Sequence, residues 1–545
     1  MKKIKIYLLI ATIAVGAFSC KKFDTLLDNP NLPSPTSADV DLYLNQVQLS
    51  AASFFSQAEG LSSPLVRMYV YYGPTYSNGY SPQSFDGIWG TAYQGVLKNA
   101  NAMIPVAKSQ AKYFHAAIAE VLKAYTLFTL VDLFGDVPYS EANLGVDNQN
   151  PKADPGASVY KAAIDLLDSA ISDLNRTSVT PASILFSPST KAGWIKVATT
   201  LKLRAYANTR LVDNTVGAKI QALVTGGNLI TATADEFTFK YGSKQSTPNS
   251  RHPGYNSNYV ASGGAGDYIG VYFMYALFSE KGITDPRIRY YLYRQTGTSP
   301  GNVQQEPCAF QTRPAHYSAT DPFCDFNNKS GYWGRNHGDA TGIPPDGNLR
   351  TVPGVYPVGG KFDCDDKTAT VLNTGGQGAG ISPIWMSFFT DFTLAEAALT
   401  TTGYTGDARA LLLSGLTKSI NRVMAFPAEV ATTACAAQTP SAASVTAYIN
   451  FVMAQYDAAT TTSLKLDVIL KEYYLALWGN GLDAYNMYRR TSRPRGLQPT
   501  VLPGPGPFIR SFLYPSAYVN LNTNAKQKPD WAQKVFWDTN PDALF

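Results

Sequence analysis

The sequence predicts a mainly α-helical protein in which a tetratricopeptide-like helical-hairpin body carries a large, irregular, loop-rich ligand-binding region. Between about residues 39 and 235, and again between about 383 and 490, apolar side chains recur every third or fourth residue, as in amphipathic helices. From about 240 to 380 this periodicity fades, and Gly, Pro, Asn and Tyr become frequent. Long stretches without periodicity in a compact protein are commonly functional loops.

The N-terminus reads as an export signal. Three lysines within the first five residues precede an apolar run from Ile6 to Phe18, which ends at Ser19-Cys20. The run is shorter than the roughly 20 residues that a membrane-spanning helix needs. A small residue directly before Cys is typical of bacterial lipoprotein signals. We therefore predict a signal peptide at residues 1–19 and lipidation of Cys20, with ordinary signal cleavage nearby as the alternative.

Residues 20–38 are rich in Asn, Pro and Ser, which predicts a tether behind the lipid anchor. We predict a single domain at residues 39–545 after it, ending in an irregular, Pro-rich wrap at 494–545. Alanines interleave with large apolar residues in the helical stretches, which favours stacked helical hairpins, although no strict repeat is present. Besides a first helix that opens at Leu42, helices are predicted at 112–134, 159–174, 190–212, 383–399 and 464–490, the last with a break at 479–481.

Four cysteines remain after Cys20, and an even number in an exported chain suits two disulfides. Three pairings are open. The one with the shortest loops joins Cys308 to Cys324 and Cys364 to Cys435.

Composition and motifs argue against several classes of function. The first 19 residues hold three lysines and no acid, so the rest of the chain is close to neutral and has no electrostatic footprint for nucleic acid. No hydrolase, metalloprotease or phosphate-loop motif is present, and the four histidines lack ligand spacing. Asp363, Asp365 and Asp366 suit calcium chemically, but a solvated loop is the favoured interpretation. We predict no cofactor and no catalytic or metal site. The paired carboxylates of a glycosidase are close in space rather than in sequence, so the sequence does not reveal such a pair.

Aromatic residues supply the positive signal. The chain has 34 tyrosines, many of them in the Gly- and Asn-rich segments. Tyr and Trp offer flat apolar area, few rotors and a polar tip, which suits the faces of sugars. Packing within loops or between helices is the competing interpretation, and it is favoured for Trp89. The candidate ligand-binding residues are Tyr76, Asn78, Tyr80, Tyr268, Tyr272, Tyr332, Trp333 and Arg335, with Asn78 and Arg335 as the hydrogen-bonding members.

Several strings resemble the SusD/RagB family, in particular its second large branch. These strings are Asp132–Ala142, Trp194–Arg204, Tyr332–Asp363, Glu396–Ala398, Gly481–Arg490 and Tyr514-Pro515 with Asn520 and Asn522. Together with the lipoprotein signal and the tether they cover almost the whole chain.

The resemblance implies four tetratricopeptide-like hairpins supporting an irregular ligand-binding face. It further implies an outer-membrane lipoprotein, facing the cell exterior, that captures oligosaccharides or peptides. Its partner would be a SusC-like TonB-dependent barrel transporter, which the protein closes as a lid. Two other classes stay open: a secreted hydrolase acting on the same polymers, and a helical scaffold.

Overall fold

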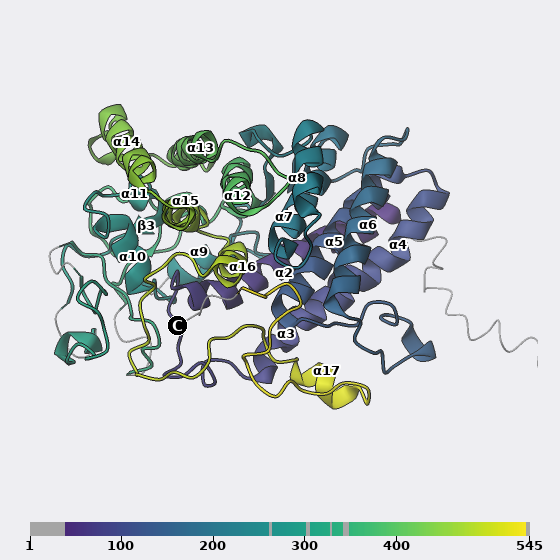
Figure 1. Cartoon of the computed structure of the whole chain (residues 1–545), viewed down its shortest axis with the longest axis horizontal. Helices are drawn as coiled ribbons and strands as arrows, with labels where there is room; N and C mark the ends of the chain where they lie inside the picture. The colour runs from purple at the N-terminus through teal and green to yellow at the C-terminus, as the bar shows by residue number, and fades with distance from the viewer. Residues whose placement is uncertain (1–38, 261–263, 301–305, 327–329, 342–347, 541–545) are drawn as a thin grey trace, which may run out of the picture.

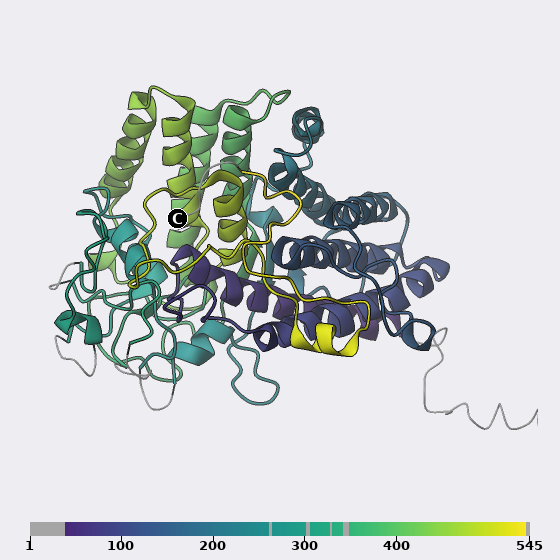
Figure 2. The same ribbon diagram turned by 60° about the horizontal axis from the view of Figure 1, so that its bottom comes forward.

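A computed structural model describes residues 39–260, 264–300, 306–326, 330–341 and 348–540. The predicted signal peptide, Cys20 and the tether lie outside the described residues. Helices dominate, as the sequence predicts, and they form two groups joined by the long helix α2 (Val40–Ser62) and by irregular segments (Figures 1 and 2).

The first group consists of the N-terminal helices. Helix α2 packs against α4 and α5, α5 packs against α6, and α6 packs against α7. Helix α5 begins after Lys112 and ends at Gly135, whose φ of 79° is one that glycine adopts readily. The group comprises α2 (Val40–Ser62), α3 (Asp86–Gly90), a π-helical turn (Thr91–Leu97), α4 (Lys98–Ser109), α5 (Tyr113–Phe134), α6 (Gly156–Leu174), α7 (Lys191–Thr209) and α8 (Val216–Thr225).

The second group consists of C-terminal helices that pack as consecutive pairs. Helix α12 contacts α13 and α15, and α14 contacts α13 and α15. The predicted break at residues 479–481 is confirmed, because α15 ends at Ala476 and α16 begins at Gly481. The group comprises α12 (Ser387–Thr400), α13 (Ala408–Glu429), α14 (Ala442–Ala458), α15 (Thr462–Ala476) and α16 (Gly481–Thr491).

The segment between these groups is largely irregular but not devoid of structure. Its short elements are α9 (Pro253–Asn258), α10 (Val271–Phe278), α11 (Ile288–Tyr291), β3 (Leu292–Tyr293) and β4 (Val352–Pro353). Strands β3 and β4 pair antiparallel. Beyond α16 the chain runs irregularly across the front of the molecule in Figure 1, interrupted by α17 (Ser516–Leu521).

One predicted helix starts too early. The sequence predicts a helix from residue 383, whereas Ile381–Trp385 is strand β5 and the helix α12 begins at Ser387. Strand β5 pairs with β2 (Phe237–Lys240), which also pairs with β1 (Phe186–Ser187), all antiparallel. All five residues of β5 are buried, so the strand lacks the alternation of apolar and polar residues that identifies a half-buried strand, and periodicity does not separate it from a buried helix.

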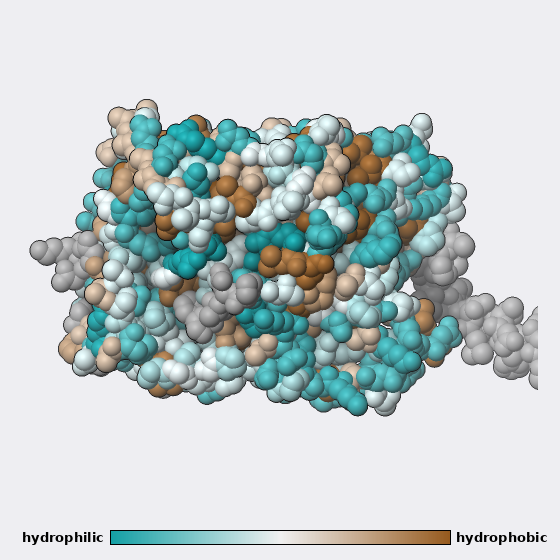
Figure 3. Space-filling model, in the orientation of Figure 1, coloured by the Kyte–Doolittle hydropathy of each residue, from teal (hydrophilic) through white to brown (hydrophobic). Residues whose placement is uncertain are grey.

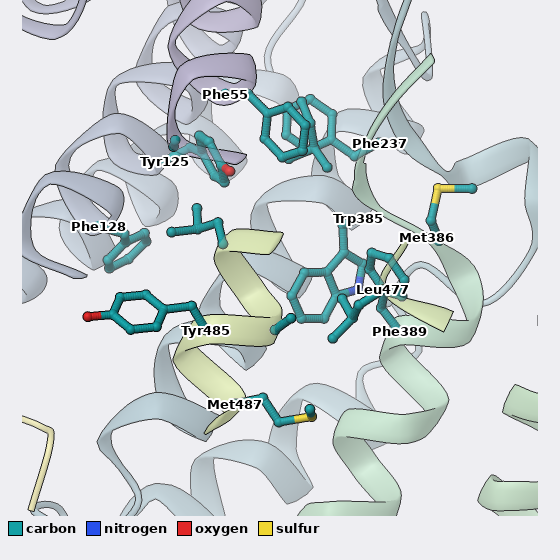
Figure 4. Close-up of a cluster of buried hydrophobic side chains, with 14 of the residues drawn as sticks. Phe55, Tyr125, Phe128, Phe237, Trp385, Met386, Phe389, Leu477, Tyr485 and Met487 are labelled. Carbon is teal, nitrogen blue, oxygen red and sulfur yellow. The ribbon is translucent and has the colours of Figure 1, made fainter. Parts of the chain in front are cut away.

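The main core lies where the two helical groups meet the three-stranded sheet. Figure 4 shows Phe55 of α2, Tyr125 of α5, Phe237 of β2, Trp385 of β5 and Phe389 of α12 around one interior. Helix α5 is buried on all sides, which fits a central rather than an amphipathic helix. This framework fixes the ends of the segments that form the pocket described below.

A buried group of polar side chains, here called the Asp132 cluster, ties distant parts of the chain together. The Asp132 carboxylate accepts hydrogen bonds from Arg204 at 2.9 Å, Asn486 at 2.9 Å and the Trp537 indole at 3.0 Å. Arg204 also pairs with Asp483 at 2.6 Å. Several family-like strings therefore meet inside the protein, where they stabilise the fold. The cluster consists of Asp132, Tyr160, Arg204, Asp483, Asn486, Arg489 and Trp537.

Two disulfides fasten the irregular region. Cys308 is bonded to Cys324, and Cys364 is bonded to Cys435, which is the pairing with the shortest loops. The second bond ties the segment before β5 to the connection between α13 and α14. The face in Figure 3 is mainly hydrophilic, with apolar residues in small separate groups. Among the described residues, no helix combines the length and apolarity that crossing a bilayer requires.

Candidate functional site

Most of the aromatic residues predicted to bind ligand lie inside the protein. Tyr272, Tyr332 and Trp333 are almost completely buried, and Trp333 exposes only 1% of its surface. The Tyr332 ring lies beside Phe278, with centroids 5.5 Å apart. The expectation that Tyr332 and Trp333 present their rings to solvent is therefore wrong in this conformation. Local Gly and Asn content suggests an exposed loop there, but the loop folds into the body.

The backbone explains how a loop without periodicity is buried. Two hydrogen bonds join Trp333 to Thr351, one through the backbone N–H of Trp333 and one through its backbone carbonyl. The Trp333 N–H donates to the Thr351 hydroxyl at 3.0 Å, and the Thr351 N–H donates to the Trp333 carbonyl at 3.0 Å. Backbone polar groups satisfied in this way are buried at little cost.

The segments around Tyr76 and around Arg335, which both hold candidate residues, meet mostly below the surface. The Tyr76 hydroxyl lies 3.2 Å from Nε2 of His337 and accepts a hydrogen bond from Arg67 at 3.3 Å. Arg335 is buried, with its guanidinium carbon 4.8 Å from the centre of the Tyr268 ring. Asn78 is exposed, and its side-chain oxygen accepts from the Thr75 hydroxyl at 2.8 Å.

A pocket of about 410 Å³ opens next to these segments. Of the predicted residues, Tyr80 and Tyr268 line it. We call it the Glu59 pocket. Its walls come from the end of α2, the segment after it, the start of α9, the segment before α10, and the turn between α15 and α16. The residues used below are Glu59, Tyr69, Tyr72, Tyr80, Asp267, Tyr268 and Trp478.

Stacked rings make one wall of the Glu59 pocket. The Tyr69 ring lies on the Trp478 ring, with centroids 5.3 Å apart and planes within 18°. Phe273 supports the same indole at 4.7 Å. The indole N–H donates to the carbonyl of Tyr356 at 3.2 Å, which fixes the ring. The half-buried Tyr69 thus rests on a rigid aromatic base.

The rim carries a more exposed ring. Tyr72 exposes 40% of its surface, and its ring meets the edge of Tyr268 with centroids 5.8 Å apart. Tyr80 also lines the pocket and is half-buried, and it donates its hydroxyl hydrogen to the carbonyl of Leu61 at 2.9 Å. A flat ring at the rim and another inside the wall suit a ligand with flat apolar faces.

Two carboxyl groups face the same space. Glu59 accepts a hydrogen bond from the Ser63 hydroxyl at 2.6 Å, and burial, aided by the charge of Asp267, raises its pKa to about 7. Burial also raises the pKa of Asp267, against the lowering effect of its hydrogen bond from Asn258 at 2.7 Å. Such groups accept and, when protonated, donate hydrogen bonds, which suits hydroxyl-rich ligands.

Other acidic groups are occupied by basic partners. Asp363 pairs with Arg294 at 2.6 Å, and Asp366 pairs with Lys361 at 2.5 Å. These ion pairs disfavour the calcium site considered for this segment. Among the described residues, the one cluster spaced for a metal contains Cys308 and Cys324, whose sulfur atoms are consumed by their disulfide.

Sequence reasoning identified part of the pocket. Tyr80 and Tyr268 were candidates and line the pocket. The sequence reasoning did not identify Glu59, Asp267 or Trp478 as pocket residues. A carboxylate at the end of an amphipathic helix looks like an ordinary surface residue, and Trp478 sits in an apolar run. The dipeptide Asp267-Tyr268 behind glycines was the nearest available signal.

Solved structures of SusD-type proteins share this helical fold. A SusD/RagB family protein from Bacteroides thetaiotaomicron has a TM-score of 0.67 and 19% identity, covering 93% of this chain and 100% of its own. A SusD homolog from Bacteroides fragilis gives 0.66 and 18%, covering 92% and 99%. A chitin-binding SusD homolog from Flavobacterium johnsoniae gives 0.61 and 18%, covering 93% and 98%.

A family model described as "Starch-binding associating with outer membrane" matches residues 33–515. The chain belongs to this SusD-like family. No curated protein matches it.

Proposed function

We propose that the protein is a nutrient-binding lipoprotein of the outer membrane that holds a glycan in the Glu59 pocket. The observation that carries this proposal is the aromatic wall of Tyr69 on Trp478, with the exposed Tyr72 ring at the rim. Rings with few rotors bind sugar faces without a large loss of entropy. The family's starch-binding description and the chitin-binding homolog support a glycan as the ligand.

Binding is tested by titration calorimetry against a panel of starch-type, chitin-type and other oligosaccharides, with peptides included. Tyr72→Ala should weaken binding of the best ligand about tenfold, or about 1.4 kcal/mol, with little change in stability, because much of the ring is exposed. The matched control is Tyr113→Ala, a half-buried tyrosine at the start of α5 and outside the pocket. Equal affinities for both variants would place the site elsewhere.

The Glu59 pocket also contains a group that could serve in hydrolysis rather than in binding alone. A carboxyl with a pKa of about 7, as at Glu59, has the property of a general acid. The stacked aromatic rings favour a binding protein. A hydrolase is the second candidate because of the Glu59 carboxyl group alone. Incubating the protein with the bound oligosaccharide and separating the products decides between them. Shortened products that vanish in Glu59→Gln would establish hydrolysis.

The proposal also covers how the protein is attached to the membrane and which transporter it assembles with. Cys20 carries the lipid, and the protein acts as the lid of a TonB-dependent barrel transporter. The family's association with the outer membrane supports this arrangement. Cys20→Ala should release the protein from membranes, and unchanged membrane fractionation would contradict lipidation.

The barrel should co-purify from native membranes in mild detergent, since a stable lid needs an interface beyond roughly 2,000 Å². A protein that runs alone in such an extract would refute the lid.

A further inference from the structure

The Glu59 pocket has an unbalanced charge. Two carboxylic acids line it, Glu59 and Asp267, and no lysine or arginine does. The one histidine in the lining, His252, accepts a hydrogen bond from the Gly254 N–H through Nδ1 at 3.0 Å. Burial lowers the pKa of His252 to about 3, so this ring is neutral. The charged groups of the wall therefore all have one sign.

Within the described parts of the chain, the side-chain hydrogen bonds that the two carboxylates accept come from uncharged groups. Glu59 is bound by the Ser63 hydroxyl, and Asp267 by the Asn258 amide, and both of these partners are uncharged. The charge of Arg350 acts on Asp267 and lowers the pKa of its carboxyl group, against the larger effect of burial. Its guanidinium lies over the Tyr268 ring, 3.5 Å from the centroid, and its Nε donates to the Asp267 backbone carbonyl at 2.7 Å. Arg350 is buried and does not line the pocket.

We propose that the Glu59 pocket selects a sugar with a free, protonated amine, which sits between the Glu59 and Asp267 carboxylates while its ring lies on the aromatic wall. This inference rests on the proposed glycan-binding function and narrows its ligand to amino sugars that lack an N-acetyl group. An ammonium group offers three hydrogen-bond donors to the carboxylate oxygens.

The tyrosine rings reinforce this choice. The face of an aromatic ring attracts a cation within about 6 Å of its centre. Tyr69 and Tyr72 are partly exposed and line the pocket. Trp478 covers one face of the Tyr69 ring, and the guanidinium carbon of Arg335 lies 5.8 Å from the centre of the Tyr72 ring, so an ammonium group would approach the uncovered face of Tyr69. A neutral N-acetyl group gains neither this attraction nor the ion pairs. Calcium would require six to eight oxygen ligands, and a flat aromatic wall supplies none.

Binding of an amine should release protons. The titratable groups that interact with Glu59 are Asp267, Tyr69 and Tyr241. Both tyrosines have raised pKa values because they are buried, so they stay neutral near pH 7. Glu59 is then about half protonated at pH 7. A bound ammonium favours the ionised carboxylate and expels this proton, whereas a neutral sugar does not.

The experiment compares a glucosamine hexamer with an N-acetylglucosamine hexamer by titration calorimetry at about pH 6, where most of the amines are protonated. The expected result is at least a tenfold preference for the amine, with proton release visible as a dependence of the measured heat on the buffer. Glu59→Gln keeps an oxygen for the Ser63 hydroxyl and should reduce the preference to less than threefold. Asp267→Asn is the second variant and retains an acceptor for Asn258.

Tyr113→Ala, at the start of α5 and outside the pocket, is the matched control, since it should leave the affinity for both hexamers unchanged. Equal affinity for the two hexamers, or a preference that survives both acid variants, would overturn the amine inference and leave glycan binding intact. A lysine peptide that binds as tightly as the amine hexamer would overturn the assignment to sugars. If neither hexamer nor any glycan of the panel binds, the proposed function itself fails.

Discussion

The unusual acidity of Glu59 predicts how the stability of the protein depends on pH. Its pKa is about 7 in the folded protein, against an ordinary value of 4.5. The folded state therefore holds the Glu59 proton more tightly than the unfolded chain. Stability from this group is fully present below about pH 4.5 and is lost as pH rises through 7. At about 1.36 kcal/mol per tenfold difference, the loss amounts to at most about 3 kcal/mol.

Glu59→Gln removes this titration and keeps the acceptor for Ser63. Urea unfolding of both proteins at pH 5, 6, 7 and 8 should show the variant gaining on the wild type as pH rises, by up to about 3 kcal/mol at pH 8. Asp165→Asn is the control, because this carboxylate is exposed beside Lys161 on α6. A constant difference between wild type and Glu59→Gln, or one that falls as pH rises, would refute the reasoning.

Three further variants test how the framework is held together, each measured as the free energy of unfolding. Asp132→Ala should cost about 3–5 kcal/mol, because it leaves the buried Arg204 with one carboxylate partner fewer; a loss under 1 kcal/mol would contradict this. Replacing Cys364 and Cys435 together by Ser should cost about 4 kcal/mol for a bridge across 71 residues, and an unchanged urea midpoint would count against it. Trp333→Ala should cost about 3–5 kcal/mol while ligand affinity in the folded protein stays unchanged, and the reverse pattern would restore Trp333 to the site.

The helical framework was largely predictable because its signals are local. The helix predicted at residues 112–134 occupies Tyr113–Phe134, and the one predicted at 159–174 occupies Gly156–Leu174. The spacing of apolar residues, and Gly135 at the end of the first of these helices, predict the helix ends to within a few residues. The error at β5 shows the limit, since Ile381–Trp385 is buried on both faces and shows no alternation of apolar and polar residues.

The pocket was only partly predictable because burial of a loop depends on distant partners. Trp333 lies among Gly, Asn and Ser, yet Thr351 holds it inside. Tyr72, from an equally tyrosine-rich segment, remains at the rim. Burial raises the pKa of Glu59, and the charge of Asp267, more than 200 positions away in the chain, adds to this effect. No local pattern encodes either relationship.

The membership of the Asp132 cluster bears on how such proteins diversify. Its residues come from α5, α6, α7, α16 and the segment after α17, and Trp537 reaches Asp132 across 405 positions. None of the seven lies between residues 240 and 380. Insertions, deletions and substitutions in that stretch therefore leave the central polar bonds of the framework unbroken. A single architecture can in this way exchange its recognition loops and acquire new ligands while retaining its interior.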